Sequence, residues 1–294
     1  MSLRTQLHTS SQMFRSFIPV LSCAAVLIGV THAQDYQLKN GRRIPAAQVK
    51  AAGDNFTAVL NGIGGNPETL NFGLKDIAQV SIPEPAELGK ARALLVNGKA
   101  AEAAEAVKPA LEKTKALQSI PGSWWPDALV VQIDALAAAG KSITDLAGAD
   151  EATLRKLPPS DADEVQEMIK IASVAKDAKP ETIEKIKDVA TRTASSWIQG
   201  RAWLEIGNLY ANQGKMEDAV KAWLRVPVFS GAEKDLALRG TLAAARGLQQ
   251  MSLPLDGIQL LDDYLTDNQL TSYKDLIESE KKKLTPKDKA TGKN

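Results

Sequence analysis

Residues Trp203 to Trp223 read WLEIGNLYANQGKMEDAVKAW, and this stretch decides the fold that we expect for most of the chain. Trp203, Ile206, Gly207 and Tyr210 recur at steps of three, one and three residues. That spacing places the four side chains on one stripe of a helix. The stripe predicts a helix that buries this face against a neighbour.

A second helix is predicted directly after the first. Gly214 ends the first helix, because glycine readily adopts the left-handed conformation at a helix C-terminus. Ala219, Val220 and Trp223 then form a second apolar stripe. We expect the small residues Gly207 and Ala219 to let the two antiparallel helices approach closely, while the aromatic side chains fill the remaining volume. One such hairpin cannot bury both of its apolar faces, so we expect further hairpins to stack on it.

This pattern resembles the tetratricopeptide repeat (TPR), in which W-x2-L-G-x2-Y is followed by A-x3-F. The match has Ile in place of Leu and Trp in place of Phe, and it is defined by Trp203, Ile206, Gly207, Tyr210, Ala219 and Trp223. Weaker copies of the pattern occur elsewhere between residues 86 and 279. The resemblance implies a mostly α fold, a TPR-like solenoid of helical hairpins, that binds a partner without catalysing a reaction. An unrelated helical hairpin is the alternative interpretation.

Residues 34–82 differ from the rest of the chain, because Val, Ile, Phe and Thr alternate there with polar residues in short runs. We expect strands near Tyr36–Leu38, Arg43–Ala51, Asn55–Leu60, Glu68–Phe72 and Ile77–Ser81, with turns at Asn40-Gly41 and Gly53-Asp54. These elements predict a small β-rich module, an SH3- or Sm-like half-barrel. Pro83-Glu84-Pro85 marks the boundary with the helical part.

The helical part is expected to contain roughly five pairs of helices. Besides the central hairpin, we predict helices over 86–97 with 100–114, 126–139 with 142–157, 161–178 with 180–194, and 234–250 with 255–265. Pro109 is expected to kink or end the helix that contains it. Residues 280–294 are rich in lysine and poor in apolar side chains, which predicts a frayed helix end and a disordered tail.

The first 33 residues have the layout of a secretory signal peptide. Arg4 and Arg15 precede an apolar run from Phe17 to Val30, and Thr31-His32-Ala33 follows it. The run is too short for a comfortable transmembrane helix. We therefore expect a bacterial protein that is exported, periplasmic or secreted, after cleavage behind Ala33. An uncleaved anchor is an alternative.

Removal of this leader would change the chemistry available to the protein. Both histidines, His8 and His32, and the single cysteine, Cys23, lie within the leader. Without them the chain has no Cys/His zinc site, no thiol nucleophile and no Ser-His-Asp triad, and we expect neither a metal nor a cofactor. Lipidation at Cys23 is a further alternative.

The charge balance bears on the class of partner. Two of the 36 basic residues lie in the leader, which leaves 34 basic against 35 acidic residues, a net charge of −1. Phosphate binding needs clustered positive charge, so this balance argues against nucleic acid as a partner. Membrane contact is expected only through an uncleaved leader or the basic tail.

In TPR proteins the first helix of each pair lines a concave groove in which peptides usually lie. The resemblance therefore implies that residues beside the packing stripe contact a partner. The peptide-groove candidates are Arg92, Arg201, Asn208, Asn212, Arg239, Arg246 and Gln249. Arg and Asn side chains on adjacent helices can bind a carboxylate through charge-assisted hydrogen bonds. The expected partner is thus a protein or peptide, with an acidic segment or a C-terminal carboxylate; an ordinary solvated face is the alternative.

Two other functions stay open. The chain could be a structural spacer in an envelope complex that docks through its β-rich module. A carboxylate-dependent cell-wall hydrolase would need two carboxylates on opposite walls of a cleft. Acidic residues such as Asp161, Asp163, Glu164 and Glu167 are instead expected to scatter over helix surfaces, so we predict no enzyme.

Trp124-Trp125-Pro126 precedes a predicted helix. Paired tryptophans can grip an aromatic or sugar ligand, but we favour packing between helix pairs as their role. The same packing role is predicted for Trp197.

Overall fold

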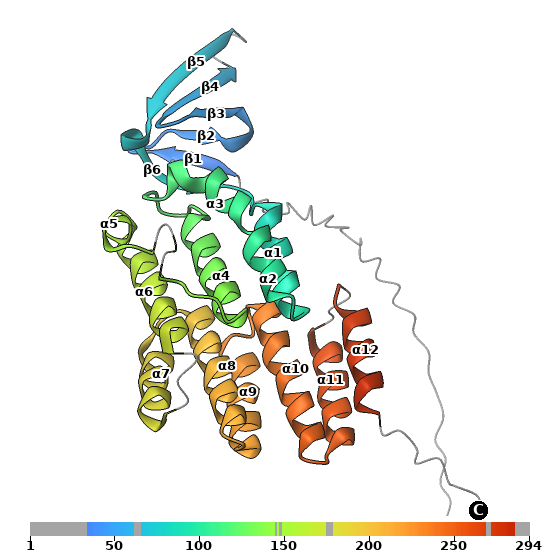
Figure 1. Cartoon of the computed structure of the whole chain (residues 1–294). Coiled ribbons are helices and arrows are strands. Elements are labelled where there is room, and N and C mark those ends of the chain that lie inside the picture. Colours follow the sequence, from blue (N-terminus) through green and yellow to red (C-terminus); the bar gives the residue numbers. More distant parts are fainter. Residues whose placement is uncertain are drawn as a thin grey trace, which may run out of the picture. The chain divides into compact units, whose positions relative to one another are not determined.

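The structure is a computed structural model that describes residues 34–61, 66–144, 146, 149–174, 179–268 and 272–285 (Figure 1). This part of the chain is mostly helical, and a small β region precedes the helices. The predicted signal peptide, with Cys23 and the expected cleavage site behind Ala33, lies outside the described residues. So do residues 286–294 of the predicted tail.

The β region of the described chain consists of two antiparallel sheets of three strands, with the orders β2-β1-β6 and β3-β4-β5. Its strands are β1 (Asp35–Leu38), β2 (Arg43–Pro45), β3 (Val49–Ala52), β4 (Asn55–Asn61), β5 (Pro67–Gly73) and β6 (Ile77–Ser81). The predicted strand over 43–51 is divided into β2 and β3 by a short 3-10 helix, η1 (Ala46–Gln48). Pro45 explains this change, because proline has no N–H to continue the strand ladder.

The core of the β region is aromatic and is shared with the helical part. The Phe56 and Phe72 rings stack with their centroids 5.5 Å apart. Leu117 and Ile120, which follow α3, belong to the same apolar cluster. The indole Nε1 of Trp124 also donates a hydrogen bond to the carbonyl oxygen of Ile82, at 2.8 Å. These contacts join the two parts of the chain.

The helical part begins at Ala86, directly after Pro83-Glu84-Pro85, as predicted. The helices of the described chain are α1 (Ala86–Val96), α2 (Ala100–Ala106), α3 (Lys108–Thr114), α4 (Trp125–Ala138), α5 (Glu151–Leu154), α6 (Pro159–Val174), α7 (Pro180–Arg192), α8 (Ser196–Asn212), α9 (Met216–Phe229), α10 (Lys234–Gln250), α11 (Pro254–Asn268) and α12 (Lys274–Leu284). Short 3-10 helices occur at η2 (Leu74–Asp76) and η3 (Lys115–Leu117).

Two predicted helices are altered in the structure. The helix expected over 100–114 is divided into α2 and α3, because Pro109 lies in the first turn of α3 and cannot continue the hydrogen bonding of α2. In the described residues, the helix expected over 142–157 is reduced to the single turn of α5.

The prediction of a disordered tail from residue 280 is wrong for residues 280–284, which form the last turns of α12. Leu284 is buried, and Glu280 is only 3% exposed and forms an ion pair with Arg246. The lysine-rich composition conceals this packing, because the run Lys281–Lys283 stands between Glu280 and Leu284, which lie four residues apart on one face of the helix.

The predicted central hairpin is confirmed, and Figure 1 shows α8 and α9 side by side. Trp203 and Trp223 are 6% and 7% exposed, and Tyr210 is half-buried. Ile206 and Ala219 are fully buried. The packing role that we favoured for the other tryptophans also holds for Trp125, which is buried in the same core.

The first helices of the pairs contact one another in a closed series. α1 packs on α4, α4 on α6, α6 on α8, α8 on α10, and α10 on α1. Val96 of α1 thus shares an apolar cluster with Leu238 and Leu242 of α10. In a solenoid whose repeats touch only their neighbours, the first and last helices would not meet. Here, segments that are far apart in the sequence meet around one region.

Gly207 makes the close approach of α8 and α9 possible, since a Cβ atom there would lie 2.3 Å from the Trp223 ring. We expect Gly207→Ala to lower the free energy of unfolding by about 1–3 kcal/mol, because the core would be overpacked. Urea denaturation measures this change. Gly89→Ala is the matched control: its Cβ would find its nearest atom at 3.8 Å, and alanine favours the helix by roughly 0.5–1 kcal/mol. Equal effects of the two substitutions would contradict the packing described here.

Candidate functional site

Two adjoining cavities lie where α1, α4, α6, α8 and α10 meet, with volumes of about 290 and 180 Å³. We call them together the polar cavity. Both are lined by Arg92, Val131, Trp197 and Glu233. Further side chains that matter for its chemistry are Asp127, Glu164 and Ser195 in the larger part, and Lys234, Asp235 and Arg239 in the smaller part.

Most of these side chains come from the beginnings of helices. Asp127 lies in the first turn of α4, next to a proline that suits the start of a helix. Ser195 caps α8, and its Oγ accepts a hydrogen bond from the Ile198 N–H at 3.3 Å, which places Trp197 in the first turn. Glu233 directly precedes α10. Carboxylates are favoured near helix N-termini by the helix dipole, and the closed series of helices brings these N-termini together.

Asp127 is an unusual carboxyl group. Burial in the polar cavity raises its pKa to about 6; Arg92 opposes this shift, while the charges of Glu164 and Asp161 add to it. The Arg92 Nη2 atom is 3.7 Å from Asp127 Oδ1, and its Nη1 donates a hydrogen bond to Glu84 Oε1 at 3.0 Å. The Asp127 side chain is 45% exposed, since it faces the cavity.

Glu164 is perturbed in the same direction. Burial raises its pKa, a hydrogen bond with Ser195 opposes the shift, and the charges of Asp161, Glu167 and Glu233 add to it. The prediction that the acidic residues scatter over helix surfaces is therefore wrong for Glu164. It shares a cavity with Asp127 and Glu233, so the three carboxylates repel one another.

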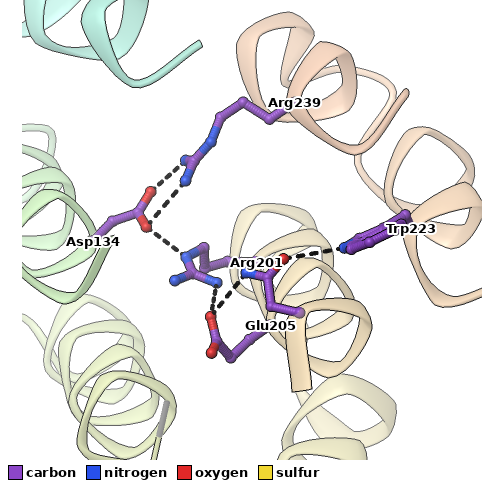
Figure 2. Close-up of polar contacts among 6 residues, drawn as sticks. Asp134, Arg201, Glu205, Trp223 and Arg239 are labelled. Carbon is purple, nitrogen blue, oxygen red and sulfur yellow. Dashed lines mark hydrogen bonds and ion pairs between the residues drawn. The ribbon is translucent and has the colours of Figure 1, made fainter. Parts of the chain in front are cut away.

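A buried ion-pair network adjoins the polar cavity and connects α4, α8 and α10 (Figure 2). Arg201 Nε donates a hydrogen bond to Asp134 Oδ1 at 2.5 Å, and its Nη1 donates to Glu205 Oε2 at 3.0 Å. Arg239 Nη2 donates to Asp134 Oδ1 at 3.3 Å. Asn208 extends the network, because it donates to Glu205 and accepts a hydrogen bond from Trp223 Nε1 at 3.2 Å.

The charges of this network balance. Complete burial disfavours the ionised form of Asp134, but Arg201 and Arg239 lower its pKa to about 2. Asp134 and Glu205 in turn raise the pKa of Arg201 in spite of its burial. Asp134 and Arg201 are thus held as ions in the interior, and their pairing with Arg239 and Glu205 fixes the three helices relative to one another.

Arg201 was predicted to face an open groove, and this prediction is wrong. Arg201 is only 1% exposed, because its ion pair with Asp134 of α4 and the contacts of α8 with α6 and α10 enclose it. Asn208 is half-buried and bonded to Trp223. Asn212, at the end of α8, is exposed.

The candidates on α10 have different environments. Arg239 lines the polar cavity while it binds Asp134. Arg246 and Gln249 dock α12: Arg246 Nε donates to Glu280 Oε1 at 2.6 Å, and Gln249 Nε2 donates to the Lys283 carbonyl oxygen at 3.0 Å.

Arg92, Arg201, Arg239 and Arg246 therefore each form an ion pair with a carboxylate of this chain. The sequence indicated correctly that they suit carboxylates. The carboxylates, however, come from the protein itself.

The structure also reveals residues that sequence reasoning did not select. Asp127, Trp197 and Glu233 had no predicted binding role, and Trp197 was expected to be core. Trp197 does pack against the core but is half-buried, and it forms a wall of both parts of the cavity. Only the position of Asp127 behind Pro126, at a helix start, offered a local signal. No spacing in the sequence connects it to residues 164, 197 and 233.

The chain matches no protein-family model, no curated protein and no solved structure. Within the described ranges, no three His, Cys, Asp or Glu side chains are grouped so that they could hold a metal ion. None of the helices described for the chain has the length and apolar character needed to span a bilayer.

Substitution of Arg201 tests the buried network. We expect Arg201→Met to lower the free energy of unfolding by about 3–5 kcal/mol, because Glu205 and Asp134 would lose a buried partner. The control is Arg192→Met, which removes an exposed ion pair with Asp188 and should change stability by about 0–1 kcal/mol. Chemical denaturation gives both values. Similar losses in the two variants would show that the network does not stabilise the fold.

The pKa of Asp127 predicts a pH dependence of stability. Its folded-state pKa of about 6 lies above that of an unfolded aspartate, about 3.9, so folding favours the protonated form. Protonated Asp127 therefore contributes to the free energy of unfolding below about pH 4, and this contribution is lost as the pH rises through 6. In Asp127→Asn the free energy of unfolding should no longer fall over this pH range. In Asp163→Asn, at an exposed position of α6, it should fall as in the wild type. Urea denaturation between pH 4.5 and 7 measures the difference, and identical profiles would contradict it. The depressed pKa of Asp134 acts with the opposite sign and only below about pH 4.

Proposed function

We propose that this chain is a non-catalytic protein-binding scaffold of the bacterial cell envelope, and that it recognises its partner through the polar cavity. The observation that carries the proposal is the construction of this cavity. Five helices, spread from α1 to α10, contribute its lining, and the neutral network around Asp134 adjoins it. Binding sites are typically preformed concavities with a few convergent polar groups, and this cavity has that character.

The size of the cavity bears on what it can receive. Small-molecule sites usually occupy about 300–1,000 Å³, and the two parts here measure about 290 and 180 Å³. The cavity suits one side chain or one chain terminus better than a whole folded segment. A protein partner would insert one such group and make its remaining contacts on the surrounding surface.

The resemblance to TPR proteins supports a binding role. The partner would, however, bind at the polar cavity and not in the concave groove expected from the sequence. The packing of α8 on α9 through Gly207 and Trp223 is what the repeat pattern implies. We propose that the helical pairs are a degenerate TPR-like array. The contact between α10 and α1 closes the series of first helices, so the partner would bind at the helix N-termini around the cavity and not along an open groove. The residues predicted to line the groove then serve mainly to hold the helical pairs together.

Export is also part of the proposal. It rests on the sequence between Arg4 and Ala33, whose charged start, apolar run and small final residue are typical of a signal peptide. A spacer role for the β region alone is less favoured, since its core includes Leu117 and Ile120 of the helical part. A module that shares its core in this way is part of the scaffold.

A second candidate function, hydrolysis that uses two carboxylates, is favoured by one observation. Asp127 and Glu164 line the same cavity, and the pKa of Asp127 is raised to about 6, where a carboxyl group can still donate a proton near neutral pH. Cell-wall glycans are the substrate class that fits an exported protein with this chemistry.

Blocking the cavity tests the main proposal. Ala194 is exposed and lines the larger part of the cavity, so Ala194→Trp should fill the cavity without changing any charge. The full chain is used to capture proteins from an envelope extract, and we expect Ala194→Trp to reduce recovery of its main partner at least about tenfold, equivalent to about 1.4 kcal/mol. Ala101→Trp, at an exposed site on α2, should have no effect.

If Ala194→Trp captured the main partner as well as the wild type does, the proposal that the partner binds at the polar cavity would be wrong. Release of sugar from peptidoglycan fragments by the wild-type chain, lost in Asp127→Asn and Glu164→Gln, would instead establish the hydrolase.

A further inference from the structure

The basic side chains that line the polar cavity are already engaged. Arg92 donates to Glu84, and Arg239 forms its ion pair with Asp134. The ammonium group of Lys234 donates a hydrogen bond to Asn268 Oδ1 at 2.9 Å. A negatively charged ligand would therefore have to displace partners within the protein.

The acidic side chains of the cavity, in contrast, are mostly not engaged with a cation of the protein among the described residues. Within the described part of the chain, neither Glu164 nor Glu233 forms an ion pair, and the nearest cation to Asp127 is Arg92, at 3.7 Å. Asp235 differs from these three, because it accepts a hydrogen bond from the Tyr273 hydroxyl at 2.8 Å. Partial burial raises the pKa of Asp127 and of Glu164, so the cavity disfavours the ionised form of these two carboxylates. A bound cation would offset this cost.

One further feature of the cavity concerns the chemistry of the ligand. Trp197 lines both parts, and tryptophan is the aromatic side chain that attracts cations most strongly.

We propose that the polar cavity receives the ammonium or guanidinium group of a lysine or arginine residue of the partner, held by Asp127, Glu164 and Glu233, with Trp197 as a wall. This inference rests on the proposed binding function and specifies its chemistry. Because the proposed partner is a protein, we take an amino-acid residue as the source of the cation, and not a free diamine, which carries two positive charges at pH 7. At about 290 Å³, the larger part of the cavity accommodates a single side chain of this length.

Capped amino acids test the proposal on the full chain by isothermal titration calorimetry at pH 7. We expect Nα-acetyl-lysine methylamide or its arginine counterpart to bind at least about tenfold more tightly than the neutral norleucine compound, a difference of about 1.4 kcal/mol. The preference should diminish as salt concentration rises. It should also weaken at pH 5, where Asp127, with a pKa of about 6, is largely protonated.

Paired variants connect this preference to the cavity. The double substitution Glu164→Gln and Glu233→Gln preserves shape and removes two charges, so it should abolish the preference for the cationic compounds. Glu217→Gln is the control, since Glu217 is exposed on α9 and pairs with Lys221. Thermal unfolding of each variant shows whether its fold is intact. If the double variant unfolds, Asp127→Asn replaces it in the same titration.

The outcomes separate this inference from the proposed function. Equal binding of the lysine and norleucine compounds, or no binding of any of them, would overturn the cationic ligand. If Ala194→Trp still blocked partner capture in that case, the proposed function would stand. Tighter binding of 1,4-diaminobutane than of the capped lysine would support the cationic site and identify a free diamine as its source.

Discussion

One buried carboxylate holds three helices together. Asp134 of α4 binds Arg201, 67 residues further along the chain, and Arg239, 105 residues further along. Asp134 and Arg201 are fully buried and Arg239 is largely buried, so each ion depends on the others for its stability. The arrangement tolerates little displacement of α4, α8 or α10, because movement of any one helix would leave a charge unpaired in the interior.

This network also determines the character of the polar cavity. Within the network, the positive charge of Arg239 compensates the negative charge of Asp134. At the edge of the same region, Arg92 forms an ion pair with Glu84. Both arginines of the cavity are thereby paired with carboxylates of the protein, while Glu164 and Glu233 are left without a cation in the described residues. The proposal that the ligand carries a positive charge follows from this difference in pairing between the basic and the acidic side chains.

Close packing explains how the helices can stand near enough for these ion pairs. A Cβ atom on Gly207 would meet the ring of Trp223, and one on Gly247 of α10 would lie 2.6 Å from Val220. The backbones of α8, α9 and α10 therefore approach one another through glycine, with a large side chain of α9 filling each contact. Larger residues at these glycines would push α8 and α10 away from α9 and disturb the positions of Arg201 and Arg239 relative to α4.

The sequence by itself determined the local structure of this protein. Alternation and turn residues located the strands, and the stripe from Trp203 to Trp223 located the hairpin, because these features depend on residues within one or two turns of each other. Only the tertiary structure decided what each polar stripe faces. Periodicity places Arg201, Asn208 and Asn212 on one side of α8 but does not say whether that side meets solvent or another helix. Arg201 is buried because α4 carries Asp134 at the point of contact, and α12 packs because Arg246 pairs with Glu280, 34 residues away. The polar cavity likewise needs side chains from residue 92 to residue 239, and no short-range pattern connects positions so far apart.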